Sequence, residues 1–191
     1  MKTSVLAAAL SLAFSTGAFA QAGSVQRDVN QQQRIEQGLQ SGQLTTKEAS
    51  RLEGEEARVE RDQQRAMKDG KLTPAEKQRL SREQNQVSRD IYREKHDAQK
   101  GNPDSASSQR MQADVQRNVN QQQRIEQGVK SGSLSTRETA KLEGGQARDS
   151  RKEARAGSDG NVSKGEQHRI RHAENRQSRK IHREKHDGQT K

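Results

Sequence analysis

The feature that most constrains the fold of this 191-residue chain is an internal duplication. The segment VQRDVNQQQRIEQG at 25–38 returns almost unchanged at 115–128, and REKHD at 93–97 returns at 183–187. Both repeats are shifted by 90 residues, without an insertion between them. A fixed spacing of this kind indicates one supersecondary unit used twice.

We therefore expect two tandem units, at residues 25–97 and 115–187. The segment between them, 98–114, contains Gly101, Pro103 and several serines, so it is predicted to be a flexible linker. Within each unit, a shorter motif of the form Gly-x-Leu/Val-Thr/Ser-x-x-Glu occurs twice. Its four copies begin at Gly42, Gly70, Gly132 and Gly160.

This short motif is typical of a helix end followed by a helix start. The glycine can take the left-handed conformation that terminates a helix. The apolar residue can pack between the two helices, and the hydroxyl residue with the later Glu forms a capping box. Pro74 stands at the first helical position, where proline is well tolerated. The motif therefore predicts glycine-hinged helical hairpins.

The predicted fold is all-α, with three helices in each unit. Leu, Ile, Val and Phe make up only about 14% of the chain, below the ~20% typical of folded domains. Glycines at 54, 144, 145 and 165 stand inside expected helices, where each costs about 1 kcal/mol. We therefore expect marginally stable units and no large-cored enzyme. The helices are expected at about 25–40, 46–68, 74–96, 115–130, 136–157 and 164–186.

Residues 1–20 resemble a secretory signal peptide. A basic Lys2 precedes an apolar run from Val5 to Phe14, and small residues end at Ala20. The apolar run is shorter than the ~20 residues that span a bilayer, although an uncut membrane anchor is the alternative. We expect cleavage after Ala20 and a periplasmic or secreted protein. The chain contains no Cys, so disulfides cannot stabilise it.

Four histidines in the second unit predict a metal site. They are spaced by 4, 10 and 4 residues, which places them on one face of a helix. Histidines at i and i+4 can share a Zn²⁺, Cu²⁺ or Ni²⁺ ion, but a complete site needs further ligands, from Glu174, Glu184 or a partner. The alternative is a solvated polar face. The candidate ligands are His168, His172, His182 and His186.

The second unit is also strongly basic, with a net charge of +7 against +1 for the first. This excess is typical of a surface that binds anionic polymers or partner proteins, as a structural or chaperone-like protein would. The chain has one tyrosine and no tryptophan, so sequence-specific nucleic-acid binding is disfavoured, and a solvated face is the alternative. The residues singled out on the last helix are Arg169, Arg171, Arg176, Arg179, Lys180 and Arg183. On the preceding helix Arg148, Arg151, Lys152 and Arg155 add to the excess.

Two hairpins resemble the second half of an EF-hand loop, through Asp69 with Glu76 and Asp159 with Glu166. This resemblance implies calcium ligands at loop positions 5 and 12. However, Arg65 and Arg155 stand where the first carboxylate belongs, and a helix cap accounts for the same residues. Calcium binding is therefore not expected.

The sequence carries no catalytic motif: it has no Cys, no G-x-S-x-G and no phosphate-binding loop. We expect a non-enzymatic protein. Self-association is one of the interactions that we consider for it. The chain resembles a group of uncharacterised exported helical-repeat proteins of Gram-negative bacteria. Two segments carry this resemblance, QQQRIEQG-x-x-SG-x-L-[TS]-x-x-E and the terminal REKHD. This resemblance implies export and helical character only.

Overall fold

The structure is a computed structural model that describes residues 16–187, with side chains from residue 21. The described residues form six α-helices and no strand, which confirms the predicted all-α fold. None of these helices combines the length and the apolar character needed to cross a membrane. Most of the predicted signal peptide lies outside the described residues. The helices are α1 (Thr16–Gln40), α2 (Thr46–Ala66), α3 (Pro74–Lys95), α4 (Ala106–Lys130), α5 (Thr136–Ala156) and α6 (Lys164–His186).

The four hinges have the predicted local structure. Their glycines have positive φ angles of 70°, 91°, 73° and 87°, in chain order, which only glycine adopts without strain. A complete capping box begins the helix after every hinge. The apolar residue packs on the preceding helix: Leu44 is fully buried, and a Cβ on Gly38 would lie 2.6 Å from its side chain. Leu134 has the same relation to Gly128.

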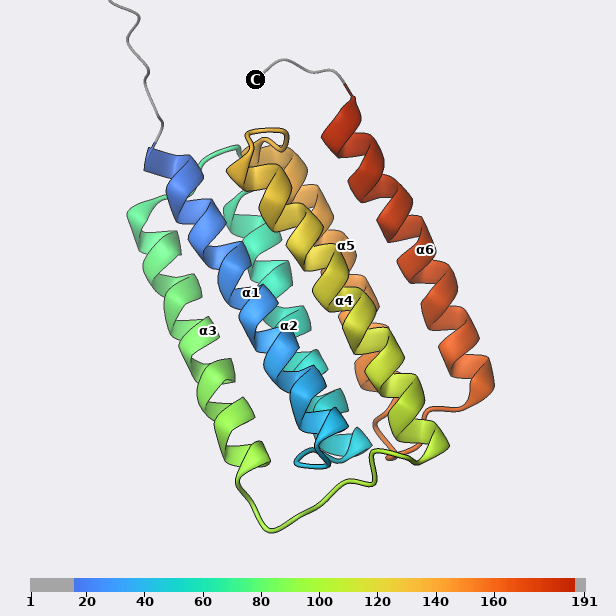
Figure 1. The fold of residues 1–191 in the computed structure, drawn as a ribbon. Coiled ribbons are helices and arrows are strands. Elements are labelled where there is room, and N and C mark those ends of the chain that lie inside the picture. Colours follow the sequence, from blue (N-terminus) through green and yellow to red (C-terminus); the bar gives the residue numbers. More distant parts are fainter. Residues whose placement is uncertain (1–15, 188–191) are drawn as a thin grey trace, which may run out of the picture.

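The two sets of three helices pack face to face (Figure 1). The most extensive contact joins α2 to α5, and the next joins α1 to α4. Gly54 faces Ala154 near one end of the α2–α5 contact, and Gly144 faces Gln64 near the other, so these helices are antiparallel. Helices α3 and α6 lie at opposite edges (Figure 1).

Equivalent residues of the two repeats meet at the centre of this contact. Ser150 donates a hydrogen bond from Oγ to Oε2 of Glu60, 3.1 Å away, and the two positions are 90 residues apart. An antiparallel contact in which equivalent positions meet is the arrangement of an approximate two-fold axis. The duplicated sequence therefore pairs with itself inside one chain.

The predicted linker is shorter and better packed than expected. Helix α4 begins at Ala106, with Ser105 as its N-cap, so the prediction of a linker through residue 114 is wrong. In the remaining connection, the amide of Gly101 donates a hydrogen bond to the carbonyl of Gly42, 2.9 Å away. A Cβ on Gly101 would lie 2.2 Å from the carbonyl oxygen of Leu44. Glycine is therefore needed here for close packing rather than for flexibility.

Apolar side chains are buried mainly at the two ends of the four central helices. One cluster contains Ile35, Leu39, Leu52, Met111 and Val115 with their neighbours. The other, at the opposite end, gathers its members from α1, α4, α5, α6 and the α4–α5 hinge. These members are Val25, Ile125, Val129, Leu134, Leu142 and Ile181.

Between the apolar clusters, the middle of the bundle is polar. We call the fully buried polar residues of this region the polar layer. Its members on the four central helices are Asp28 and Gln32 of α1, Glu53, Glu56, Glu60 and Gln63 of α2, Asp114, Asn118 and Gln122 of α4, and Glu143, Gln146, Ser150 and Glu153 of α5.

The sequence suggested that the glycines inside α5 weaken the helix, but the structure gives them a packing role. A Cβ on Gly144 would lie 2.4 Å from the amide carbon of Gln64, and one on Gly145 would lie 2.0 Å from Oε1 of Gln177. Gln177 in turn donates a hydrogen bond to the carbonyl of Leu142, 2.9 Å away. These glycines make room for two amide side chains, the half-buried Gln64 of α2 and the buried Gln177 of α6.

Candidate functional site

A groove of about 510 Å³ runs between the C-terminal part of α5 and the N-terminal part of α6. The buried side chains of Ala156 and Ile170 lie at its apolar part. Its remaining lining residues are mostly basic: Lys152, Arg155, Arg169 and Arg176, together with His172 and Glu166.

A second hollow of about 150 Å³ continues along the same two helices and shares Lys152 and Arg176 with the first. It adds Arg148 of α5 and Lys180 of α6, and one acidic residue, Asp149. The two hollows together form what we call the basic groove. Its cations are Arg148, Lys152, Arg155, Arg169, Arg176 and Lys180.

The charges of the basic groove are close enough to influence one another. Partial burial and the nearby guanidinium of Arg148 lower the pKa of Lys180. Burial raises the pKa of Asp149, although Lys152 donates a hydrogen bond to its Oδ1, 2.6 Å away. The groove thus contains six cations, one hydrogen-bonded acid and one capping Glu. An anion bound in the groove would reduce the repulsion among these cations.

The hollow of the first unit that is equivalent to this second hollow lies between α2 and α3 and carries the opposite charge. This hollow of about 330 Å³ is lined by Glu55, Asp62, Glu83 and Asp90, with one basic residue, Arg58. Burial raises the pKa of Glu55 to about 7, and the nearby Asp90 carboxylate adds to this shift.

Residue-by-residue comparison shows where the charge changes. At positions 90 residues apart, Asp62 is replaced by Lys152, and Asp90 by Lys180. At a third position Gln86 gives way to Arg176. The same backbone scaffold therefore carries an acidic groove on one edge and a basic groove on the other.

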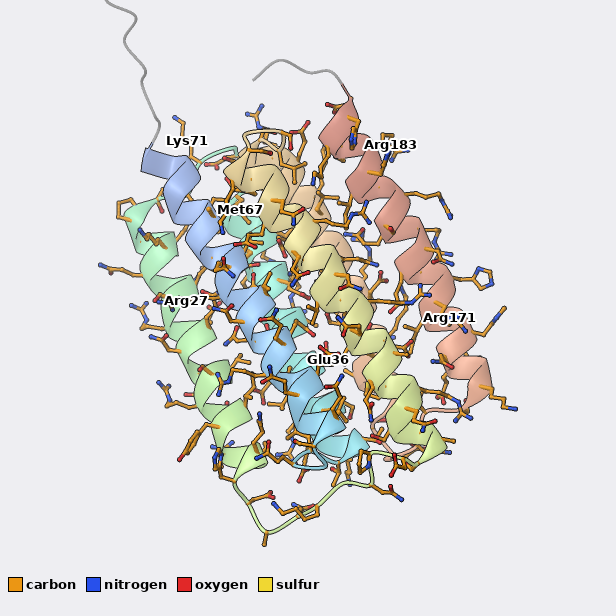
Figure 2. The ribbon with its side chains drawn as sticks, in the orientation of Figure 1. Arg27, Glu36, Met67, Lys71, Arg171 and Arg183 are labelled. Carbon is orange, nitrogen blue, oxygen red and sulfur yellow. The ribbon has the colours of Figure 1, made fainter. Side chains whose placement is uncertain are left out.

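The six basic residues singled out on the last helix are divided by the structure. Arg169, Arg176 and Lys180 line the basic groove. Three others, Arg171, Arg179 and Arg183, are exposed and do not line the groove; Arg171 and Arg183 are labelled on α6 in Figure 2. The predicted set is therefore a mixture of groove residues and exposed residues outside the groove.

The predicted histidine row lies on the exposed side of α6 and consists of two separate pairs. In the first pair, Nε2 of His168 and Nε2 of His172 are 3.0 Å apart. Two imidazole nitrogens at this distance would subtend about 90° at an ion placed about 2.1 Å from each. That angle suits the square-planar or tetragonal geometry of Cu²⁺ or Ni²⁺, whereas tetrahedral Zn²⁺ needs about 3.4 Å.

The second pair has a different geometry. The rings of His182 and His186 are stacked, with centroids 4.3 Å apart and planes inclined by 18°. Nδ1 of His186 lies 2.7 Å from the carbonyl oxygen of His182, so this nitrogen is engaged by the backbone. Among the described residues, no group of three or more closely spaced ligand side chains includes a histidine. Each pair by itself therefore offers two ligands at most.

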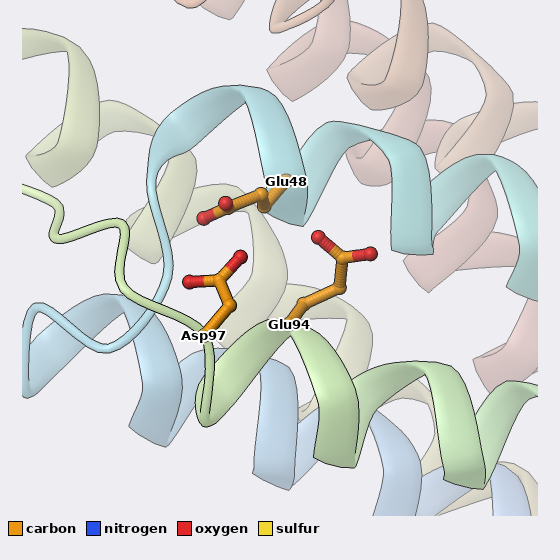
Figure 3. A group of neighbouring side chains, drawn as sticks. All are labelled: Glu48, Glu94 and Asp97. Carbon is orange, nitrogen blue, oxygen red and sulfur yellow. The ribbon is translucent and has the colours of Figure 1, made fainter.

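The structure also brings three carboxylates together where α2 begins and α3 ends. Oxygens of Glu48, Glu94 and Asp97 lie within 4.8 Å of one another (Figure 3). Arg51 forms an ion pair with Glu94 at 3.0 Å, and Glu48 accepts the capping hydrogen bond from the amide of Thr45. The equivalent group in the second unit consists of Glu138, Glu184 and Asp187.

The residues that resemble EF-hand ligands are used by the hinges themselves. Oε2 of Glu76 and of Glu166 accept the capping bonds from Thr73 and Ser163. The two aspartates accept backbone hydrogen bonds within their own turns: Asp69 from Lys71 at 2.9 Å, and Asp159 from Asn161 at 2.8 Å. Neither pair belongs to a group of three close ligands among the described residues. These contacts favour a capping role over a calcium site.

The buried acids of the polar layer are functional candidates that sequence reasoning missed. No Lys, Arg or His is buried among the described residues, so these acids have no cation in the interior. A signal was present in α2, where Glu53, Glu56 and Glu60 continue the helical spacing of Leu52. Carboxylates on a core-facing stripe are the pattern that could have revealed them.

Comparisons with known proteins give no match: no family model matches the chain, and no curated protein or solved structure is found to be similar. The residues and their geometry are therefore the basis for any statement about function.

Proposed function

We propose that the protein is an exported, non-enzymatic binding protein whose basic groove holds an anionic polymer. The observation that carries this proposal is the charge reversal between the second hollow of the basic groove and the equivalent hollow of the first unit. Lys152 and Lys180 replace Asp62 and Asp90 in an otherwise repeated scaffold. The lining also changes in size, since Val59 and Val87 are replaced by Asp149 and Gln177, but the helices that bear the two hollows are equivalent.

The composition of the groove suits a chain of phosphate or sulfate groups. Arg169 and Arg176 can each form paired hydrogen bonds with two oxygens of one anionic group. Lys152 lies in both parts of the groove, so it can contact successive groups of a linear polymer. Each neutralised anion releases counterions, which makes the affinity strongly dependent on salt.

Binding of heparin and of inorganic polyphosphate, measured by calorimetry over a series of salt concentrations, tests the proposal. The informative variant gives the basic groove the residues of the first unit: Lys152→Asp, Arg176→Gln and Lys180→Asp. A control of equal charge change replaces three exposed lysines elsewhere: Lys68→Asp, Lys71→Asp and Lys100→Gln.

We expect the groove variant to lose about tenfold or more in affinity at low salt, and its salt slope to decrease by about three. The control should retain most of the affinity, because its lysines lie outside the groove. Equal losses in the two variants would show that net charge, and not the groove, is responsible. An affinity that does not change with salt would also refute the proposal.

A second candidate function is the binding of a transition-metal ion, favoured by the 3.0 Å separation of the facing nitrogens of His168 and His172. The pair would provide two neighbouring equatorial ligands for Cu²⁺ or Ni²⁺, with solvent or another molecule completing the site. His172 also lines the basic groove. The surrounding cations oppose a bare metal ion, and for that reason we place this function second.

A further inference from the structure

The polar layer has an unusual electrostatic composition. Seven of its members are fully buried carboxyl side chains: Asp28, Glu53, Glu56, Glu60, Asp114, Glu143 and Glu153. Transfer of an ionised carboxylate into a protein interior is costly unless a cation or several hydrogen-bond donors accompany it. The interior of the described chain contains no buried cation.

Hydrogen bonds satisfy only part of this layer. Gln32 donates to Glu53 at 3.0 Å, and Gln122 donates to Glu143 at 3.1 Å, which is the same bond in each repeat. Neither carboxylate oxygen of Glu56, however, has a hydrogen-bond partner. A fully buried, unpartnered carboxylate has no means of stabilising a negative charge.

The acids also face one another across the helix contacts. Glu56 is close to Asp28 of α1 and to Glu53, Glu55 and Glu60 of its own helix.

Glu60 faces Glu143 of α5. Glu153 faces Glu53, Asp114 of α4 and Glu174 of α6. From α3, the amide of Gln84 donates to Asp28 at 2.6 Å.

The cations nearest to this region belong to its margin. The charge of Arg27 partly offsets the rise in the pKa of Asp28 that burial causes. Arg117 and Arg171 have the same effect on the pKa values of Asp114 and Glu174. None of these arginines is itself buried.

We propose that the polar layer is a proton-dependent lock: the bundle closes around protonated carboxyl groups, and it loosens at the α2–α5 contact when rising pH removes their protons. A protonated carboxyl is neutral and can donate to a neighbouring oxygen, whereas two ionised carboxylates repel each other. Since α2 and α5 supply five of the seven acids and form the main contact between the repeats, ionisation acts where the two halves meet.

The direction of the pH effect follows from the protonation states. Burial raises the pKa of Asp28 and of Glu53 to about 7. Burial, with neighbouring acids, raises the pKa of Glu56 and Glu60 well above the ordinary value. In the unfolded chain the same groups lose their protons near pH 4. The folded state therefore binds more protons, and its stability falls as pH rises from about 4 through the folded-state values.

Urea denaturation followed by circular dichroism, at pH 5 and at pH 8.5, tests this inference. We expect a lower urea midpoint at pH 8.5. Between its unfolded-state and folded-state pKa, each buried acid reduces the folding equilibrium constant by about tenfold per pH unit. The variants Glu56→Gln and Glu60→Gln should reduce this pH dependence. Glutamine already stands at the position equivalent to Glu56, as Gln146. The matched control is Asp104→Asn, at an exposed position.

A midpoint that stays constant or rises between pH 5 and pH 8.5 would overturn the proposal, even if neither variant folds. Titration with Ca²⁺ or Mn²⁺ at pH 8.5 shows whether protons or metal ions stabilise the buried carboxyl groups. If millimolar metal restores the pH 5 midpoint and a chelator removes the effect, then a cation, and not a proton, is the missing partner. Absence of such a rescue supports the proton-dependent lock.

Discussion

Gln63 donates a hydrogen bond from Nε2 to Oδ2 of Asp28, 2.7 Å away, at a point where α2 packs on α1. At the equivalent point of the second repeat, Nδ2 of Asn118 donates to Oε2 of Glu153, also at 2.7 Å. The acid and the amide have exchanged helices, yet the hydrogen bond remains. At this point both repeats therefore contain one amide donor paired with one carboxylate acceptor.

This exchange predicts a rescue experiment. Gln63→Glu alone should reduce the free energy of unfolding at neutral pH by about 1–3 kcal/mol, because it places two buried acids side by side. Addition of Asp28→Asn rebuilds the pairing of the second repeat and should recover most of the loss. A double-mutant cycle from urea denaturation measures the coupling, expected to exceed ~1 kcal/mol. Strictly additive effects would show that the pair is not a unit.

The last glycine before the α5–α6 hinge should not tolerate a methyl group. A Cβ on Gly157 would lie 2.8 Å from Cβ of Ser50 and 3.2 Å from the carbonyl oxygen of Thr46. We expect Gly157→Ala to destabilise the protein by about 1–3 kcal/mol, as overpacking does.

Gly165→Ala provides the matched control, since its nearest side-chain atom would be Nη1 of Arg169 at 3.9 Å. This substitution should stabilise α6 by about 0.5–1 kcal/mol. Urea denaturation at pH 5 compares the two variants. Similar stabilities would mean that the α2–α5 contact is looser than the structure shows.

The two histidine pairs should differ in metal affinity. Calorimetric titration with Cu²⁺ or Ni²⁺ should show binding that His168→Ala and His172→Ala each weaken by about tenfold or more. His182→Ala should have a smaller effect, because the stacked rings and the backbone contact of His186 leave that pair poorly arranged for chelation.

His96→Ala is the control, since this single histidine has its Nδ1 2.7 Å from the carbonyl oxygen of Tyr92. Affinity should fall in acid, because imidazole must lose its proton to bind a metal. If Cu²⁺ binds the double variant lacking His168 and His172 as tightly as the unmodified protein, the first pair is not the site.

Local signals in the sequence were sufficient to predict the hinges. The glycine, the apolar residue and the capping box act within seven residues, and all four copies form as expected. The early start of α4 was missed because Ser and Gln at 105–112 have no apolar periodicity. Their helix is stabilised by burial of Ser108 and Met111 against the other helices.

The arrangement of the two repeats, and with it both grooves, could not be read from the sequence. The positions of Lys152 and Asp62 are separated by 90 residues, and only the tertiary fold shows that they line equivalent hollows. The histidine spacing predicted a shared helix face but not the difference between facing and stacked rings. That difference depends on side-chain rotamers, which spacing alone does not determine.

The interior acids also affect how the protein would behave in an electric field. The formal charge of +10 counts every carboxyl group as ionised. Glu56, Glu60, Glu143 and Glu153 all have pKa values raised well above the ordinary value by burial. Each of these groups that keeps its proton makes the net charge of the folded protein one unit more positive than its composition indicates. The folded protein would therefore migrate toward the cathode faster than its amino-acid count implies, and unfolding at constant pH would slow that migration by releasing protons.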